Sequence, residues 1–156
     1  MPYLEWAREG FLELSPGSVI EYRDVRARLE WGARMFRLEE ICWDPWNSRE
    51  LSSRMEEAGY VCVEVCQGFQ SLSEPSKKLL ELVASARLYH GDHPVLRWNA
   101  SCLNAKWAND NLMFAKPDRG KNSSRIDGIS ATVNALSRAL VLEGNTINYT
   151  GLKLVG

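Results

Sequence analysis

The alternation of helical and strand-like patterns along the chain is the feature that most constrains its fold. Apolar runs at residues 38–43 and 60–66, the second reading YVCVEVC, have the length and β-branched composition of buried strands. A segment with helical spacing separates them, and further helical segments follow. Because strands joined through helices pair in parallel, the sequence predicts an α/β domain with a central mixed, mainly parallel sheet flanked by helices.

The remaining elements are predicted from apolar spacing, capping residues and turn signals. Residues 3–22 are expected to be irregular, and Pro75 is expected in the first turn of its helix. The expected helices are 24–36, 47–58, 73–86, 94–103 and 125–142, with a short strand at 87–90 and a hairpin at 105–116. We therefore expect one domain over residues 1–144 and a loosely extended tail over residues 145–156.

Composition places the chain among ordinary folded soluble domains, with 45% hydrophobic and 25% charged residues in a total of 156. No run of about 18 apolar residues occurs, and the acidic, amphipathic N-terminus differs from a signal peptide. Cys62 and Cys66 would lie about 13 Å apart on one strand, too far for a disulfide. These features predict a cytoplasmic protein with free thiols.

Charge is distributed unevenly along the chain. Residues 1–96 have a net charge of −5, whereas residues 97–125 have a net charge of +4. The basic side chains of the second segment are Arg97, Lys106, Lys116, Arg119, Lys121 and Arg125. A solvated loop explains such a segment, and so does a surface that faces a polyanion such as DNA. The charge alone leaves both interpretations open.

Two carboxylates stand at element boundaries. In EEICWDPWN, Asp44 ends a predicted strand, where reactive groups of parallel α/β sheets gather, but an Asp-Pro pair is also a common helix start. Asp127 completes a capping-box pattern with Ser124. If the two acids meet, their oxygens suit Mg²⁺ or Mn²⁺, and such ions promote phosphodiester hydrolysis. The spacing does not decide between capping and metal binding.

A histidine pair and the six tryptophans have simpler interpretations. His90 and His93 form an HxxH pair, but Gly91 and Pro94 interrupt any regular helix there. No cysteine or third histidine lies near in sequence, so we do not expect a structural zinc site. The tryptophans are expected to anchor the core rather than to stack on bases.

Several stretches of the chain resemble a known family. They read PYLEWAREGFLELSPGSVIEYRDV, CWDPWN, VEVCQGFQSLSEPSKKLLELVASARLYHGDHPVLRW and RIDGISATVNAL. In this order they resemble the C-terminal nuclease domain of the terminase large subunit of tailed bacteriophages and prophages, over residues 3–142. The resemblance implies an RNase H-like fold. It also implies a phosphodiester hydrolase that cuts concatemeric viral double-stranded DNA during genome packaging in the bacterial host cytoplasm.

The resemblance also implies roles for individual residues. Asp44 and Asp127 match acids that hold divalent metal, Mg²⁺ or Mn²⁺, in a two-metal site, and His90 matches a histidine of the catalytic set. Gln67 matches a glutamine to which we assign an orienting role. The residues then expected along the DNA backbone are Arg97, Lys106, Lys116, Lys121 and Arg125. The implied partners are viral double-stranded DNA, the terminase small subunit and the portal.

The chain departs from the family pattern at its start. The family's first metal-binding aspartate lies on a strand before the YxxW segment, whereas here Met1 comes just before Tyr3, so we expect the first strands of the fold to be missing. The ATPase motif GxxxxGK[ST] is also absent from this sequence. We therefore expect weakened metal binding, and either homodimer formation through an exposed sheet edge or an N-terminal segment that covers that edge.

Three functions remain open at this point. The chain is an active nuclease, or a catalytically silent prophage remnant that binds DNA or packaging partners, or an unrelated α/β domain in which Asp44 and Asp127 only cap helices. Cleavage that depends on Asp44 distinguishes the first from the second. The effect of metal on the stability of an Asp127 variant distinguishes the third.

Overall fold

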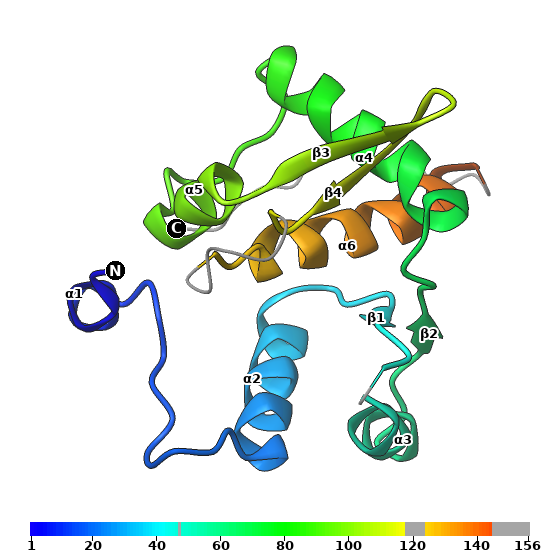
Figure 1. The fold of residues 1–156 in the computed structure, drawn as a ribbon. Coiled ribbons are helices and arrows are strands. Elements are labelled where there is room, and N and C mark those ends of the chain that lie inside the picture. The colour runs from blue at the N-terminus through cyan, green and yellow to red at the C-terminus, as the bar shows by residue number, and fades with distance from the viewer. Residues whose placement is uncertain (47, 118–123, 145–156) are drawn as a thin grey trace.

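The computed structural model of the protein describes residues 1–46, 48–117 and 124–144. These residues form six helices and four strands (Figure 1). The elements are α1 (Tyr3–Arg8), α2 (Tyr22–Met35), β1 (Ile41–Trp43), α3 (Arg49–Glu57), β2 (Cys62–Glu64), α4 (Phe69–Ala84), α5 (Pro94–Ser101), β3 (Asn104–Ala108), β4 (Asn111–Ala115) and α6 (Asp127–Gly144). The predicted mixture of helices and strands is confirmed, whereas the predicted tail at 145–156 lies outside the described residues.

The strands form two short sheets in the described part of the chain, rather than one continuous sheet. β1 pairs in parallel with β2, with Ile41 opposite Cys62, which confirms the predicted strand–helix–strand unit. β3 and β4 form the predicted antiparallel hairpin. The backbone N–H of Leu112 in this hairpin donates to the hydroxyl of Ser73 on α4 at 3.1 Å. Because the hairpin is held on α4, it lies across the helices instead of extending the β1–β2 sheet (Figure 1).

Two clusters of buried apolar side chains hold the elements together. The larger cluster joins the end of β2 to α4 and α6, and its buried members are Val65, Leu72, Leu79, Ile129 and Val133. The smaller cluster joins β1 to α3, and its buried members are Ile41, Leu51 and Met55. Val25 and Leu29 of α2 cover the smaller cluster and are only partly buried. The helix predicted at residues 125–142 from its apolar spacing is confirmed by α6, on which Ile129 and Val133 are buried.

The boundaries around α4 differ from the prediction. The helix begins at Phe69, because the backbone N–H groups of Ser71 and Leu72 both bond to the carbonyl of Gly68. Pro75 therefore lies inside the helix rather than in its first turn. Residues 87–90, which the structure describes, form no strand. The chain leaves α4 through Ala86 in a left-handed conformation, with a φ of 53°, and continues towards α5.

The N-terminal segment, predicted to be irregular, contains α1. Trp6 is buried and lies against Trp98 of α5, with ring centroids 5.6 Å apart, and Tyr3 makes an edge contact with Trp98 at 5.7 Å. Tyr3 and Trp6 are three residues apart and therefore share one helical face. The prediction that tryptophans anchor the core is confirmed for Trp6, whereas Trp46 and Trp107 are exposed.

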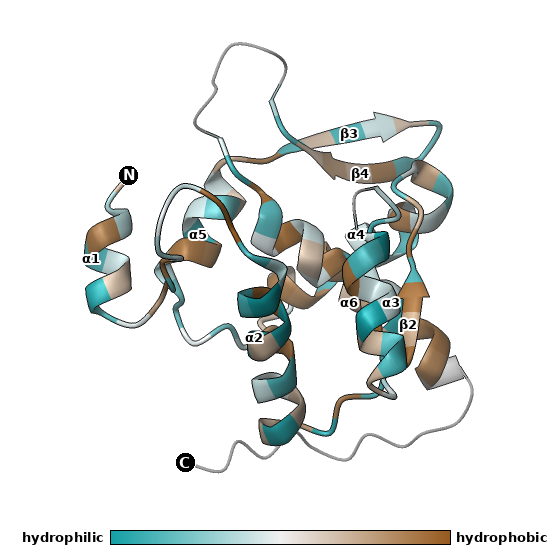
Figure 2. Ribbon diagram, turned by 90° about the horizontal axis from the view of Figure 1, so that it is seen from below, coloured by the Kyte–Doolittle hydropathy of each residue, from teal (hydrophilic) through white to brown (hydrophobic). Residues whose placement is uncertain are grey.

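The helix α2 has a mostly hydrophilic surface. Figure 2 shows hydrophilic bands along this helix, and none of its described side chains is buried.

The four cysteines all lie in the described residues and are free thiols, as predicted. Across the described ranges, the helices are too short or too polar to cross a bilayer.

Candidate functional site

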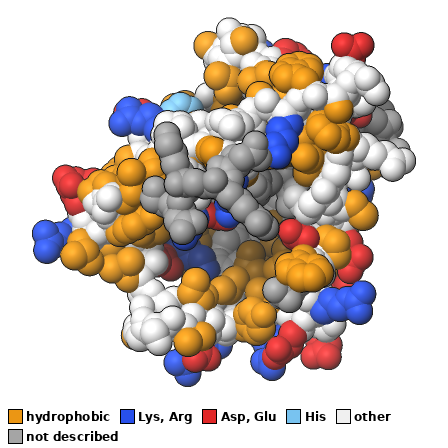
Figure 3. Space-filling view, in the orientation of Figure 1, with side chains coloured by type: hydrophobic (Ala, Val, Ile, Leu, Met, Phe, Trp, Pro, Cys, Tyr) orange, Lys and Arg blue, Asp and Glu red, His pale blue; other side chains and the backbone are white. Residues whose placement is uncertain are grey.

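A cavity of about 870 Å³ lies where β1 and β4 face α6. Figure 3 shows the surface hollowed between the upper and lower parts of the molecule. The polar side chains that line the cavity are Glu40, Asp44, Gln67, Lys106, Lys116, Asp127, Ser130 and Asn134. Five of these residues are predicted site residues, so the fold brings together positions that are far apart in the sequence.

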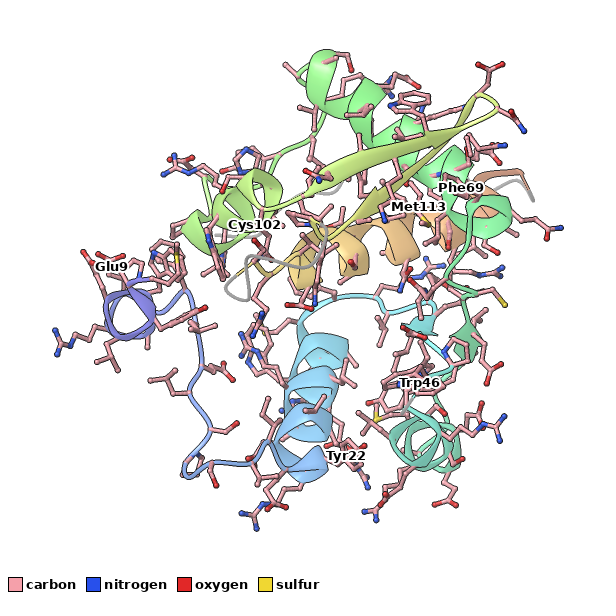
Figure 4. The ribbon with its side chains drawn as sticks, in the orientation of Figure 1. Glu9, Tyr22, Trp46, Phe69, Cys102 and Met113 are labelled. Atoms are coloured by element: carbon pink, nitrogen blue, oxygen red, sulfur yellow. The ribbon has the colours of Figure 1, made fainter. Side chains whose placement is uncertain are left out.

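Asp44 directly follows β1, as predicted, and is held in the turn that leaves the strand. Its Oδ1 accepts a hydrogen bond from the backbone N–H of Trp46 at 3.0 Å, and its carbonyl accepts one from the hydroxyl of Ser48. Figure 4 shows Trp46 on the chain between β1 and α3. The N-cap of α3 is Ser48, so Asp44 shapes a turn and is not the cap of that helix.

Asp127 is the first residue of α6, two residues later than the predicted start. Its Oδ1 lies 3.9 Å from Nζ of Lys116, and its side chain is 72% exposed. Asn99 on α5 binds the backbone on both sides of Asp127. Its Oδ1 accepts from the N–H of Gly128 at 2.8 Å, and its Nδ2 donates to the carbonyl of Arg125 at 3.0 Å. The positive end of the helix dipole also favours a carboxylate at this position.

Gln67 connects the end of the parallel sheet to α6. Its Nε2 donates to the carbonyl of Val65 at 2.8 Å and to Oδ1 of Asn134 at 3.3 Å. Since Val65 follows β2 and Asn134 lies on α6, the amide bridges the carboxyl end of the sheet and the helix that begins with Asp127. This placement supports the orienting role as a proposal and identifies Asn134 as a partner that the sequence does not reveal.

Glu40 and Arg138 form a second bridge to α6 that sequence reasoning missed. The guanidinium donates from Nε to Oε2 at 2.6 Å and from its terminal nitrogen to Oε1 at 3.1 Å. Hydrogen bonding from Arg138 lowers the pKa of the Glu40 carboxyl, and the same bond raises the pKa of Arg138. Glu40 directly precedes β1 and Arg138 lies on α6, 98 residues later, so no local sequence pattern indicates this pair.

Cys42 lies between Glu40 and Asp44 and also lines the cavity. Burial, and secondarily the charge of Glu40, raises the pKa of its thiol. A thiol with a raised pKa is a poor nucleophile and a poor metal ligand, because both roles require the thiolate. The carboxylates of Asp44 and Asp127 are therefore better candidates for metal binding at this site.

The predicted DNA-binding residues occupy different places. Lys106 and Lys116 line the cavity. Arg125 lies just before α6 and donates to the carbonyl of Ser124 at 3.2 Å. Lys121 lies outside the described residues. Arg97 is paired with an exposed carboxylate, that of Asp92, at 2.7 Å.

His90 lines a second cavity, of about 560 Å³, and not the cavity that Asp44 and Asp127 line. The walls of the second cavity come from α4, α5, β4 and α6, and most of the lining residues are apolar. His90 and Arg97 contribute its basic groups. The structure thus brings Asp44 and Asp127 to one cavity and places His90 at another.

The donors present fit a hard divalent cation, although there are few of them. Asp44 and Asp127 offer carboxylate oxygens, the ligands that Mg²⁺ and Mn²⁺ prefer. Within residues 1–46, 48–117 and 124–144, no group of three or more His, Cys, Asp and Glu side chains is arranged to hold a metal. Water and substrate oxygens would have to complete any coordination shell.

Comparison with known proteins identifies the family. A family model described as the terminase large subunit, endonuclease domain, matches residues 1–143. The chain belongs to the terminase large subunit endonuclease family. The resemblance inferred from its motifs is thereby confirmed.

Two relatives show how this terminase domain compares with longer proteins. It is 31% identical over 140 residues to the terminase large subunit of Enterobacteria phage HK97, covering 88% of this chain and 27% of that protein. It is 24% identical over 141 residues to Protein YmfN of Escherichia coli strain K12, covering 90% of this chain and 31% of that protein. The chain spans less than a third of the length of either relative.

The terminase domain also has a solved structural neighbour. The crystal structure of the HK97 bacteriophage large terminase matches with a TM-score of 0.75 and 30% sequence identity, over 88% of this chain and 29% of that one. The predicted RNase H-like α/β fold is confirmed by this similarity.

Proposed function

We propose that this terminase domain is a metal-dependent endonuclease that hydrolyses concatemeric viral double-stranded DNA during genome packaging. The observation that carries the proposal is the cavity lined by Asp44, Asp127, Gln67, Lys106 and Lys116. Carboxylates suit a divalent cation, and ammonium groups suit phosphate. The cavity therefore offers groups for both a metal and a nucleic-acid backbone.

Asp44 and Asp127 are the residues proposed to hold Mg²⁺ or Mn²⁺. The ion, when bound, would supply Lewis-acid activation of water and of the scissile phosphodiester. The bond from Trp46 to Asp44 fixes one carboxylate at the end of β1. Lys116 balances the charge of Asp127 at 3.9 Å and would turn to a phosphate oxygen when DNA binds.

The proposed DNA-binding residues are Lys106, Lys116, Arg125, Arg97 and Lys121. The first two line the cavity and would contact phosphates nearest the cleaved bond. The other three would extend the contact along the backbone. Because phosphate contacts release counterions, DNA binding should weaken steeply with increasing salt.

His90 is proposed to assist catalysis on the basis of the family resemblance alone. It lines the second cavity together with Arg97, away from the carboxylates. An unchanged cleavage rate in His90→Ala would remove it from the catalytic set and leave the roles of the two aspartates intact.

A plasmid-nicking assay tests the proposed activity. The full chain is incubated with supercoiled plasmid in Mg²⁺ and in Mn²⁺, beside Asp44→Ala, Asp127→Ala and the control Asp24→Ala on α2. We expect nicking by the wild type and the control, and none by the two cavity variants. Nicking that survives both cavity substitutions contradicts the proposal.

A second candidate function is favoured by the small number of acidic groups at the cavity. Among the described residues no cluster of three or more metal-ligating side chains is present. We therefore also propose, as the alternative, a silent remnant that binds DNA or packaging partners such as the terminase small subunit and the portal. Salt-sensitive DNA binding without any cleavage in Mg²⁺ or Mn²⁺ would support this alternative.

Self-association is part of the proposal. In the part of the chain that the structure describes, β1 pairs only with β2, which leaves its other edge open. An unpaired edge is a template for a strand from another chain. Light scattering of the wild type should give a dimer mass, and Cys42→Pro, which removes a backbone donor from β1, should reduce it. A monomer mass at high concentration contradicts this proposal.

A further inference from the structure

We infer that Asn99 is a positioning residue for Asp127, an inference that rests on the proposed function of Asp127 as a metal ligand. Asn99 lies on α5 and is 4% exposed. It accepts from the N–H of Gly128 at 2.8 Å and donates to the carbonyl of Arg125 at 3.0 Å. Because these backbone groups stand on either side of Asp127, one buried amide fixes the segment that carries the carboxylate.

The contact between Asn99 and Gly128 is too close for a larger residue at position 128. A Cβ atom on Gly128 would lie 2.7 Å from Oδ1 of Asn99 and 3.1 Å from Cδ1 of Leu96. The Leu96 methyl group can move, but the Asn99 oxygen is held by its own hydrogen bond. The glycine after Asp127 is therefore required by the buried amide on α5.

The hydrogen bonds of Asn99 also leave the Asp127 carboxylate available to bind a cation. The first N–H groups of a helix lack partners within the helix, and a nearby Asp often accepts from them. Here a side chain from another helix bonds to the N–H of Gly128. Asp127 is left 72% exposed at the cavity, 3.9 Å from Lys116. Without the Asn99 side chain, the N–H of Gly128 and the carbonyl of Arg125 would lose the partner they share, so the segment that carries Asp127 would be less fixed and would present its oxygens less well to a cation.

Mn²⁺ binding measured by electron paramagnetic resonance on the full chain tests this role. The variants are Asn99→Ala and a control, Ser73→Ala, which removes another buried acceptor of a backbone N–H, that of Leu112. Melting temperatures show how much each substitution destabilises the fold. We expect Asn99→Ala to weaken Mn²⁺ binding by about tenfold, as for other groups that orient metal ligands, and Ser73→Ala to leave it unchanged.

A pair of substitutions tests the contact itself. Gly128→Ala alone should lower the melting temperature and weaken Mn²⁺ binding, because the new methyl group displaces the Asn99 amide. In the Asn99→Ala background the same change should be harmless or stabilising, since alanine favours a helix over glycine. If Asn99→Ala does not fold, Mn²⁺ binding by Gly128→Ala tests whether the Asn99 amide positions Asp127.

The outcomes separate the inference from the proposed function. If the wild type and Asp127→Ala bind Mn²⁺ equally weakly, the proposed metal site is wrong and the inference fails with it. If the wild type binds Mn²⁺ through Asp127 but Asn99→Ala and Gly128→Ala bind within twofold of it, Asn99 only caps α6. Weaker binding by Ser73→Ala with a similar loss of melting temperature would assign the effect to general destabilisation and overturn the inference.

Discussion

The part of the molecule formed by α4, α5, the β3–β4 hairpin and α6 is packed more tightly than the part formed by α2, α3, β1 and β2. Leu112 of the hairpin and Ser76 of α4 are completely buried. In the other part Met55 is completely buried, but the described side chains of α2 include none that is buried, and Trp31 and Met35 are exposed.

The candidate site lies between these two parts. Asp127 belongs to the tightly packed part and Asp44 to the sparsely packed part. The contacts that join them are the larger apolar cluster, in which Val65 packs with α4 and α6, the ion pair between Glu40 and Arg138, and the hydrogen bonds of Gln67. The relative position of the two carboxylates therefore depends on these polar bridges as well as on the larger apolar cluster.

The largest expected effect comes from the two fully buried apolar side chains. Leu112→Ala should lower the free energy of unfolding by about 2–5 kcal/mol, because the surrounding hairpin and α4 cannot close the cavity. The loss of unfolding free energy in Met55→Ala should lie at the low end of that range, since α2 can move into the space. Urea unfolding followed by circular dichroism measures both, and equal losses would contradict the difference in packing.

Removing Arg138 should have the next largest effect. Arg138→Ala leaves the carboxylate of Glu40, whose side chain is 13% exposed, without its partner, and should cost about 1.5–3 kcal/mol. Arg54→Ala removes an exposed i,i+4 partner of Glu50 and should cost less than about 0.5 kcal/mol. Thermal unfolding of the two variants gives the comparison. A loss at Arg138 as small as that at Arg54 would mean that this bridge does not hold the two parts together.

The same ion pair predicts a pH dependence of stability. The pKa of Glu40 is lowered from its ordinary value of 4.5 in the folded state, so the pair contributes its full stability above that value. The contribution is lost as the pH falls through the lowered pKa. The difference in unfolding free energy between the wild type and Glu40→Gln should shrink between neutral and acidic pH. A difference that stays constant over this interval would show that Glu40 does not titrate against Arg138.

The smallest expected effect is at Gln67. Gln67→Ala removes two hydrogen bonds near the surface and should cost about 0.5–1 kcal/mol, whereas Gln70→Ala, on the exposed face of α4, should change stability by less than about 0.5 kcal/mol. Amide exchange should quicken in β1 and β2 in the Gln67 variant and not in the control. Unchanged amide exchange in β1 and β2 would show that the hydrogen bonds of Gln67 stabilise only their immediate surroundings.

Local sequence patterns predicted most of the helices and strands, because these elements depend on residues that are close in the sequence. The apolar stripe of α6, the parallel β1–β2 unit and the hairpin all follow from spacing and turn residues. The separation into two sheets did not follow, because it depends on the contact between Leu112 and Ser73, which are 39 residues apart. α1 was missed because Trp6 needs Trp98 of α5 to bury it.

The sequence predicted the motif residues of the candidate site but not its long-range contacts. Motif resemblance indicated Asp44, Gln67 and Asp127, and the fold places all three at one cavity. The bridges from Glu40 to Arg138 and from Asn99 to the start of α6 span 98 and at least 26 residues, so no local pattern could indicate them.

Anomalous diffraction from crystals of the full chain soaked in Mn²⁺ tests most directly whether the two parts share one metal. The account predicts a single anomalous peak within coordination distance, about 2.0–2.3 Å, of both the Asp44 and the Asp127 carboxylates. No peak there, with the two carboxylates more than about 8 Å apart, would contradict it, since that separation is well beyond the reach of a shared metal site.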